Sequence, residues 1–178
     1  MTVNPVRRPA GADIARAAAE TPVGRLFLAA TDRGLAACTF EPESAVIPRL
    51  DRAGSPGGPA DIEALDLARR ELDGYFAGRL TVFTVPCDLR SASDFSRMAL
   101  VELRRVPFGS TLTADELAQR IGRGRAVRAI GNTLATNPLC VVLPCHRVVP
   151  RGYPAEVGTH PGGAAVKRHL LALEGAAA

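Results

Sequence analysis

The sequence predicts an α/β protein in which two strands and a helix precede a mostly helical second half. Apolar residues alternate from Gly24 to Ala30 and return from Leu35 to Phe40, a pattern typical of a β-hairpin. From Ile62 onward the apolar residues recur at helical spacing instead. A chain of 178 residues is long enough to form one sizeable core or two small lobes.

The first half contains the predicted strands. Residues 1–12 are predicted to be a loose tail, and Asp32-Arg33-Gly34 turns the chain between the two hairpin strands. Residues 41–59 are rich in Pro, Gly and Ser, which predicts a mobile segment. The spacing of apolar residues predicts a helix over 62–76, and residues 80–85 form a further strand candidate.

The second half predicts three helices. The first covers residues 95–105, with Asp94 as its N-cap. A T-x-x-E capping box that begins at Thr113 opens the second, which runs through Ile121. The third covers residues 125–134. A short glycine-containing turn joins the second and third helices, which predicts a helix-turn-helix.

Basic residues are unevenly placed along the chain. Residues 1–88 carry ten basic and twelve acidic side chains, whereas residues 89–178 carry twelve basic and six acidic ones. No acidic residue occurs from Leu117 through Gly131, a stretch that includes Arg120, Arg123, Arg125 and Arg128. Such a stretch is either an ordinary solvated face or a surface that binds a polyanion.

A cysteine and a histidine adjoin at the end of an apolar run. Val141–Leu143 is predicted to be a short buried strand, and Pro144 should end its pairing because proline has no N–H. Cys145 and His146 then lie at an edge of the core. The thiolate is the nucleophilic form of cysteine, and a nearby histidine can take its proton. The residues alone leave two interpretations open, a reactive thiol and a small core residue.

Several classes of site and location are not favoured. The four cysteines form no C-x-x-C pairs, so we expect no metal site, and signatures for haem, flavin or dinucleotides are absent. No stretch of 18 apolar residues occurs, and the N-terminus lacks the apolar core of a signal peptide. We therefore expect a soluble, cytoplasmic protein with reduced thiols, no membrane association and no cofactor.

The segment Pro144-Cys145-His146-Arg147-Val148 resembles the active-site signature of the O6-alkylguanine-DNA alkyltransferases, also called methylated-DNA–protein-cysteine methyltransferases. Arg128-Ala129-Ile130-Gly131 stands where that family has an arginine-bearing helix, and Asn137-Pro138 stands at its asparagine hinge. Residues 170–175 resemble the closing helix, and Thr21-Pro22-Val23-Gly24 resembles part of the N-terminal portion. The resemblance therefore extends over nearly the whole chain.

This resemblance implies a two-lobed fold. Residues 13–88 would form a small α/β lobe in a ribonuclease-H-like arrangement. Residues 89–175 would form a mostly helical, winged-helix-like lobe that binds DNA and carries the active site. The implied activity is single-turnover DNA repair by a monomer. It transfers an alkyl group irreversibly from O6-alkylguanine in double-stranded DNA, with O4-alkylthymine as a second candidate base.

The resemblance also implies residue roles. Cys145 would accept the alkyl group, and His146 would take the thiol proton through a water. Glu174 would hold His146 in the useful tautomer, in the manner of a catalytic triad. Asn137 would brace the turn that precedes the nucleophile.

The remaining implied residues contact DNA or the flipped base. Arg128 would fill the space that the flipped nucleotide leaves in the duplex, because the reacting carbon is inaccessible within the base stack. The other expected DNA-binding residues are Arg125, Ala114 and Arg147. The expected substrate pocket consists of Val148, His160, Pro161 and Gly162.

Departures from the family pattern keep several functions open. Ala114 replaces a tyrosine that helps to push out the nucleotide, and Pro161 lacks the N–H that would bind O6. His160 could partly substitute as a donor. The candidates are a working alkyltransferase, slow or with altered substrate preference, and a lesion sensor or transcriptional regulator with weak or absent transfer. A cysteine acyltransferase or hydrolase is the third.

Overall fold

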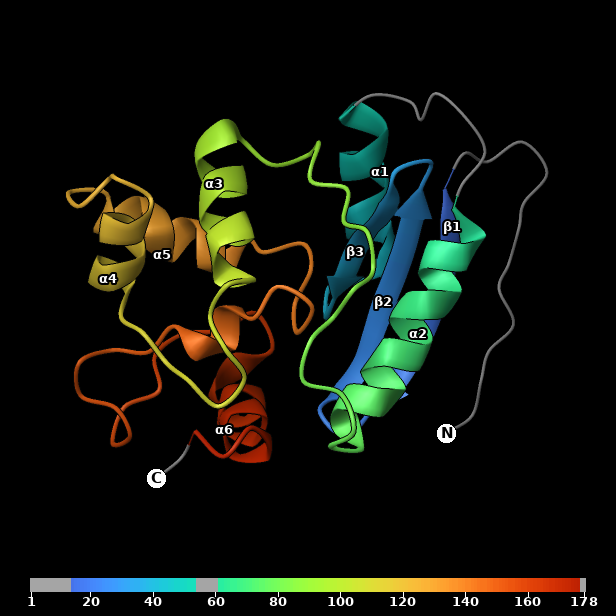
Figure 1. Ribbon diagram of the computed structural model, residues 1–178. Coiled ribbons are helices and arrows are strands. Elements are labelled where there is room, and N and C mark those ends of the chain that lie inside the picture. Colours follow the sequence, from blue (N-terminus) through green and yellow to red (C-terminus); the bar gives the residue numbers. More distant parts are fainter. Residues whose placement is uncertain (1–13, 54–60, 177–178) are drawn as a thin grey trace. The chain divides into compact units, whose positions relative to one another are not determined.

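The computed structural model describes residues 14–53 and 61–176, which form two compact units that divide between Ser91 and Ala92 (Figure 1). The predicted tail at residues 1–12 lies outside the described residues. Within the described ranges, no helix has both the length and the apolar character needed to cross a membrane.

A three-stranded antiparallel sheet forms the first unit, with strand order β1-β2-β3. Its strands are β1 (Ala15–Thr21), β2 (Gly24–Thr31) and β3 (Gly34–Thr39). The predicted hairpin is confirmed as β2 and β3. β1 was not predicted, because its alanine-rich sequence favours a helix when it is considered alone. Pairing with β2, in which Ala17 lies opposite Leu28, decides its conformation.

Two helices accompany this sheet. The helix predicted over residues 62–76 is confirmed as α2 (Ile62–Phe76), which extends along the sheet in Figure 1. Asp61 caps it by accepting a hydrogen bond from the Ala64 amide at 2.8 Å. The prediction of a mobile segment at 41–59 is wrong for its first part, because α1 (Glu43–Arg52) lies there. Burial of Val46 and Leu50 against the sheet stabilises α1 despite its internal proline, while residues 54–59 lie outside the described ones.

The prediction of a strand at 80–85 is also wrong, because backbone amides in this segment donate to a carboxylate and not to a neighbouring strand. The buried Glu71 on α2 accepts hydrogen bonds from the Thr84 amide at 2.8 Å and from the Val85 amide at 3.1 Å. Only after this segment does the chain pair with the sheet, through one parallel bridge between Leu35 and Cys87.

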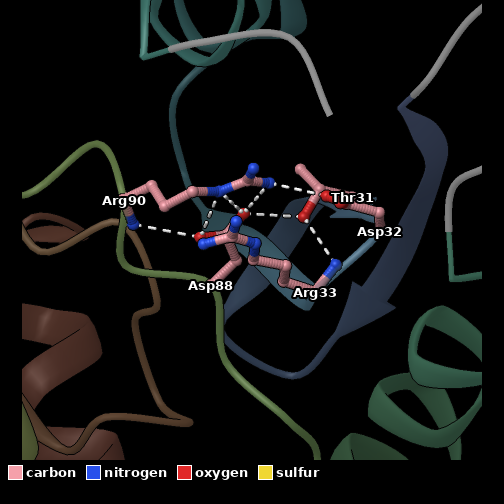
Figure 2. Close-up of polar contacts among 5 residues, drawn as sticks. All are labelled: Thr31, Asp32, Arg33, Asp88 and Arg90. Atoms are coloured by element: carbon pink, nitrogen blue, oxygen red, sulfur yellow. Dashed lines mark hydrogen bonds and ion pairs between the residues drawn. The ribbon is translucent and has the colours of Figure 1, made fainter. Parts of the chain in front are cut away.

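A polar cluster at the end of the first unit consists of Thr31, Asp32, Asp88 and Arg90 (Figure 2). Arg90 binds Asp88 at 2.6 Å and Asp32 at 2.8 Å, and Thr31 donates to Asp88 at 2.7 Å. Burial raises the pKa of Asp88, but the hydrogen bonds from Arg90 and Thr31 outweigh it and leave that pKa below its usual range. The cluster thus fixes the segment at 88–90 against the turn between β2 and β3.

The second unit is helical, as predicted. Its helices are α3 (Asp94–Leu103), α4 (Ala114–Arg120), α5 (Val127–Ala135), the short 3₁₀ helix η1 (Cys145–Arg147) and α6 (Gly163–Leu173). Helices α3, α4 and α5 pack on one another, and α6 packs on η1. The predicted capping box is confirmed, since Thr113 accepts from the Glu116 amide and Glu116 accepts from the Thr113 amide. The N-cap of α3 is Ser93 rather than the predicted Asp94.

The apolar run before the nucleophile is a turn, not the predicted strand. Val141 has a φ of 72°, and the Leu143 amide donates to the Leu139 carbonyl at 2.8 Å. The run is buried because the turn lies inside the unit. Burial alone therefore accounts for its apolar sequence, and no sheet is involved.

Candidate active site

Asn137 builds the turn that leads to the candidate nucleophile. Its side-chain amide donates to the Leu143 carbonyl at 2.8 Å, and its Oδ1 accepts from the Leu139 amide at 3.0 Å. The Asn137 side chain is buried, so its two hydrogen bonds satisfy backbone groups that water does not reach. This geometry gives Asn137 the bracing contacts that the resemblance implies.

Cys145 follows this turn as the first residue of η1 and is 3% exposed. A hydrogen bond from the Cys140 thiol is the largest influence on its pKa and lowers it, whereas burial raises it. Hydrogen bonds from His160 and Asn137 lower it further, and the result lies well below the usual range of a cysteine. The site thus favours a thiolate in a place that excludes water.

His146 and Arg147 share one carboxylate. His146 Nε2 lies 2.8 Å from Glu174 Oε1, and Arg147 Nε lies 2.8 Å from Glu174 Oε2, with all three side chains buried. Burial lowers the pKa of His146, although the contact with Glu174 raises it. The ring is therefore held in a fixed orientation and favours its neutral form.

The expectation that Arg147 binds DNA is wrong. Arg147 is 5% exposed, and besides Glu174 it donates through Nη1 to the Val106 carbonyl at 2.5 Å. Its guanidinium forms hydrogen bonds inside the unit and is not available to contact a phosphate. Arg147 therefore supports the active site instead of contacting nucleic acid.

Lys167 is a site residue that the sequence analysis did not select. Its Nζ donates to the Val148 carbonyl at 2.6 Å and to the Thr159 carbonyl at 3.3 Å. Burial lowers the pKa of Lys167 to about 8. It therefore links the expected pocket residue Val148 to the loop before α6. The sequence feature that could have identified Lys167 is that it is the only lysine in the chain.

The loop at His160, Pro161 and Gly162 lies beside the nucleophile. His160 is half-buried, and its ring centre is 6.5 Å from that of His146. The Gly162 amide donates to His160 Nδ1 at 3.1 Å. The structure thus brings His160 to Cys145, together with Cys140, which the sequence analysis had not assigned to the site. Cys140 and Cys145 lie five positions apart in the sequence, a spacing that matches no known motif. Their proximity follows from the turn at Asn137, whose carbonyl accepts a hydrogen bond from the Cys140 thiol.

The basic face lies on the predicted helix-turn-helix. Arg125 precedes α5 and Arg128 lies within it, and both side chains are exposed. Ala114 is the first residue of α4 and is half-buried. The turn between these helices has a shallow depression lined by Gly122, Arg123, Gly124, Arg125 and Ala126. This face has the exposed positive charge that binding to a polyanion requires.

A thiol activated by hydrogen bonds, on a unit that carries a helix-turn-helix, defines a protein of the cysteine-nucleophile class with a nucleic-acid-binding motif. Comparisons with known proteins agree. The family model "6-O-methylguanine DNA methyltransferase, ribonuclease-like domain" matches residues 14–89, and the corresponding DNA binding domain matches residues 94–176. The chain belongs to the family of methylated-DNA–protein-cysteine methyltransferases, which repair alkylated DNA.

Individual relatives cover most of the chain. A methylated-DNA–protein-cysteine methyltransferase of Mycolicibacterium paratuberculosis is 36% identical over 87% of this chain and 88% of its own length. One from Methanosarcina acetivorans is 32% identical over 88% of this chain and 95% of its own. The crystal structure of the Mycobacterium tuberculosis protein OGT in complex with DNA has a TM-score of 0.70 and 33% identity, covering 90% of this chain and 92% of that one.

Proposed function

We propose that this protein repairs O6-alkylguanine in double-stranded DNA and that Cys145 is the residue that accepts the alkyl group. In this reaction the Cys145 sulfur attacks the alkyl carbon, a C–S bond forms and the C–O6 bond breaks with its electron pair on the base. The proton lost by the thiol is balanced by the proton that the guanine gains. A thioether is stable, so each molecule acts once.

The observation that carries this assignment is the environment of the Cys145 thiol. Three side-chain hydrogen bonds favour its thiolate although the residue is buried. The neighbouring His146 is oriented by Glu174 through Nε2, which leaves Nδ1 as the ring atom that can take the thiol proton, through a water as in the family. The chemistry needs no external cofactor.

Exposed arginines provide the expected DNA contacts. We assign Arg125 to a phosphate contact and Arg128 to the space vacated by the flipped nucleotide, because both project from the helix-turn-helix. All the proposed groups come from one chain, so the protein is proposed to act as a monomer.

A second candidate, a lesion sensor of the same fold, rests on the base-recognition residues. Ala114 has no hydroxyl and Pro161 has no N–H, so two donors expected from the family are missing. Loss of one such donor commonly slows a reaction by about 10²–10³. A protein that binds the lesion with little transfer would then result.

Mass spectrometry separates these functions. The chain is mixed with duplex DNA that contains O6-methylguanine, digested and analysed for a gain of about 14 Da, the mass of one CH₂ group. A gain on the Cys145 peptide that disappears in Cys145→Ala supports repair. Cys38→Ala, which removes a buried cysteine of β3, is the matched control and should keep the gain. DNA binding without any gain would identify a sensor.

A further inference from the structure

Lys167 is a buried cation whose hydrogen-bond partners are two backbone carbonyls. The residue is 2% exposed, and its Nζ donates to the Val148 carbonyl at 2.6 Å and to the Thr159 carbonyl at 3.3 Å. Burial lowers its pKa to about 8, so at pH 7 the group is still mostly an ammonium. Hydrogen bonds from a charged donor are stronger than those from a neutral one. The two contacts are therefore strong enough to hold the segments that they join.

The two carbonyls lie at the two ends of one loop, residues 149–162, which we call the pocket loop. Val148 immediately precedes this loop, and Thr159 lies near its end. Gly158 has a φ of 73°, and a Cβ at this position would lie 3.3 Å from Pro150 Cδ and 3.7 Å from Lys167 Nζ. The loop therefore folds back on its own beginning, and its two ends meet beside the ammonium.

Other contacts hold the middle of the pocket loop. Val149, Val157 and Leu171 form a small apolar cluster, against which Tyr153 packs. The Tyr153 hydroxyl also donates to a backbone carbonyl that follows α6, at 2.6 Å. None of these contacts involves the lysine. Its contribution is therefore confined to the place where the ends of the loop meet.

That meeting point lies beside the candidate nucleophile. The Val148 amide donates to the Cys145 carbonyl at 3.2 Å, so Val148 belongs to the turn that carries the thiol. Thr159 directly precedes His160, whose ring centre is 6.5 Å from that of His146. One ammonium thus connects the backbone behind the nucleophile to the edge of the loop in front of it.

We propose that Lys167 is a positioning residue for alkyl transfer, which holds the loop at Thr159 against the backbone at Val148 and so fixes residues 160–162 beside the nucleophile. This inference rests on the proposed function, in which those residues bind the alkylated base. A misplacement of about 1 Å can slow a reaction by about a hundredfold. The lysine therefore acts on the transfer step, and not on the thiol or on the affinity for DNA.

The test compares substitutions of two neighbouring cations on α6. Lys167→Met keeps the length of the side chain but removes its charge and its donors, whereas Lys167→Arg keeps both. Arg168→Met removes an exposed cation and is the matched control. An apolar side chain of similar volume is often tolerated in place of a buried ion. Circular dichroism and thermal unfolding verify that each variant is folded.

Two measurements separate the loop from the reaction. Hydrogen exchange followed by mass spectrometry reports the order of residues 159–163, where the Gly163 amide donates to the His160 carbonyl at 2.9 Å. Single-turnover methyl transfer from O6-methylguanine duplex DNA, measured over a range of DNA concentrations, separates the maximal rate from the half-saturating concentration.

We expect Lys167→Met to speed exchange at residues 159–163 by about tenfold or more. Its maximal transfer rate should fall by about tenfold to a hundredfold. The half-saturating DNA concentration and the alkylation of Cys145 by iodoacetamide should stay within about threefold, because the exposed arginines and the thiol are unchanged. Lys167→Arg should recover part of the rate, and Arg168→Met should leave exchange and maximal rate unchanged.

Gly158→Ala tests the same contact from the side of the loop. An alanine there must adopt a φ of 73° and brings its methyl group against Pro150 and the ammonium. This variant should also speed exchange at residues 159–163 and lower the maximal transfer rate. It decides the proposal if Lys167→Met does not fold.

Four results would overturn the proposal. The first two are unchanged exchange and an unchanged maximal rate in folded Lys167→Met. A parallel loss of iodoacetamide alkylation would assign Lys167 to the thiol instead of the loop, and equal losses in Arg168→Met would indicate a general effect of charge. If the unmodified chain gains no methyl group, the proposed function fails, whereas the exchange series still decides whether Lys167 fixes the loop.

Discussion

Arg147 and Glu174 form a buried two-pronged ion pair, in which Nε lies 2.8 Å from Oε2 and Nη2 lies 2.9 Å from Oε1. The same carboxylate binds His146, so its negative charge is divided between two neighbours. In a catalytic triad the carboxylate stabilises a charged imidazole. Here burial lowers the pKa of His146 and Arg147 adds to that effect, so Glu174 mainly fixes the orientation of the ring.

Removal of Glu174 should strongly destabilise the second unit. Glu174→Ala leaves the Arg147 guanidinium buried without its carboxylate, which typically costs about 3–5 kcal/mol. Urea unfolding followed by circular dichroism measures this loss. Glu156→Ala removes an exposed carboxylate and should change the free energy of unfolding by less than about 0.5 kcal/mol. Similar small effects of both substitutions would contradict the importance of the buried pair.

The Cys140 thiol should determine the pH range over which Cys145 becomes reactive. Its hydrogen bond is the largest influence that lowers the pKa of Cys145, so Cys140→Ala should raise that pKa. Because the thiolate is the reactive form, iodoacetamide alkylation of Cys145 should then begin at higher pH and be slower at pH 7. The pH profile of the alkylation rate, measured by peptide mass spectrometry, provides the test.

Two variants sharpen this test. Cys140→Ser keeps a hydroxyl donor and should leave the profile near that of the unmodified chain. Cys38→Ala removes a buried cysteine of β3 and serves as the matched control. If Cys140→Ala and Cys38→Ala give the same midpoint, the contact between the two thiols has no role in activation.

Local sequence signals predicted those elements whose ends are marked by side chains. The helix at 62–76 and the capping box at Thr113 were correct because caps and helical spacing are local. Three other segments depend on distant partners. β1 requires β2, α1 requires the sheet beneath Val46, and residues 80–85 follow Glu71. None of these partners can be identified from the segment itself.

The candidate site shows the same division. The adjacent Cys145 and His146 suggested a nucleophile from the residues alone, and the resemblance added Glu174 and Asn137. Burial of Arg147 could not be anticipated, because a single arginine in a basic half of the chain reads as a surface charge. The proximity of Cys140 to Cys145 depends on the tight turn at 137–143. This turn was not predicted, because an apolar run that contains β-branched residues is typical of a strand.

Arg125 should contribute to DNA binding through charge. Arg125→Ala should weaken binding to an unmodified duplex and lower the slope of log affinity against log salt by about one. Fluorescence anisotropy over a range of salt concentrations measures that slope. The matched control is Arg79→Ala, which removes an exposed arginine of the first unit and should leave the slope unchanged. Equal slopes for the two variants would exclude a phosphate contact at Arg125.

Arg128 should matter more for transfer than for binding. Its proposed position inside the duplex stabilises the flipped nucleotide, so Arg128→Ala should slow methyl transfer by a larger factor than it weakens binding. Single-turnover rates on O6-methylguanine duplex, compared with anisotropy on the same DNA, provide the measurement. Transfer that proceeds at the original rate would show that Arg128 does not serve as the wedge.

Ala114 should limit activity on well-paired DNA. It lies at the first turn of α4. Its methyl group supplies neither the bulk nor the hydroxyl of the tyrosine that the family resemblance implies at this position. Flipping costs a few kcal/mol, and the cost is smaller for a mismatched or single-stranded base. The chain should therefore transfer methyl groups faster from mismatched or single-stranded substrate than from a matched duplex, as measured by single-turnover mass spectrometry.

Substitution of Ala114 by tyrosine tests the cause directly. Thr113 and Glu116 keep the capping box in Ala114→Tyr, so the start of α4 should be preserved. The variant should speed transfer from the matched duplex and narrow its difference from single-stranded substrate. Ala114→Phe, which adds the ring without the hydroxyl, separates bulk from hydrogen bonding. If the unmodified chain is already fast on the matched duplex and Ala114→Tyr slows it, the site is built around a small residue. Cys145 would then remain the proposed acceptor, and Ala114 would be a determinant of substrate size.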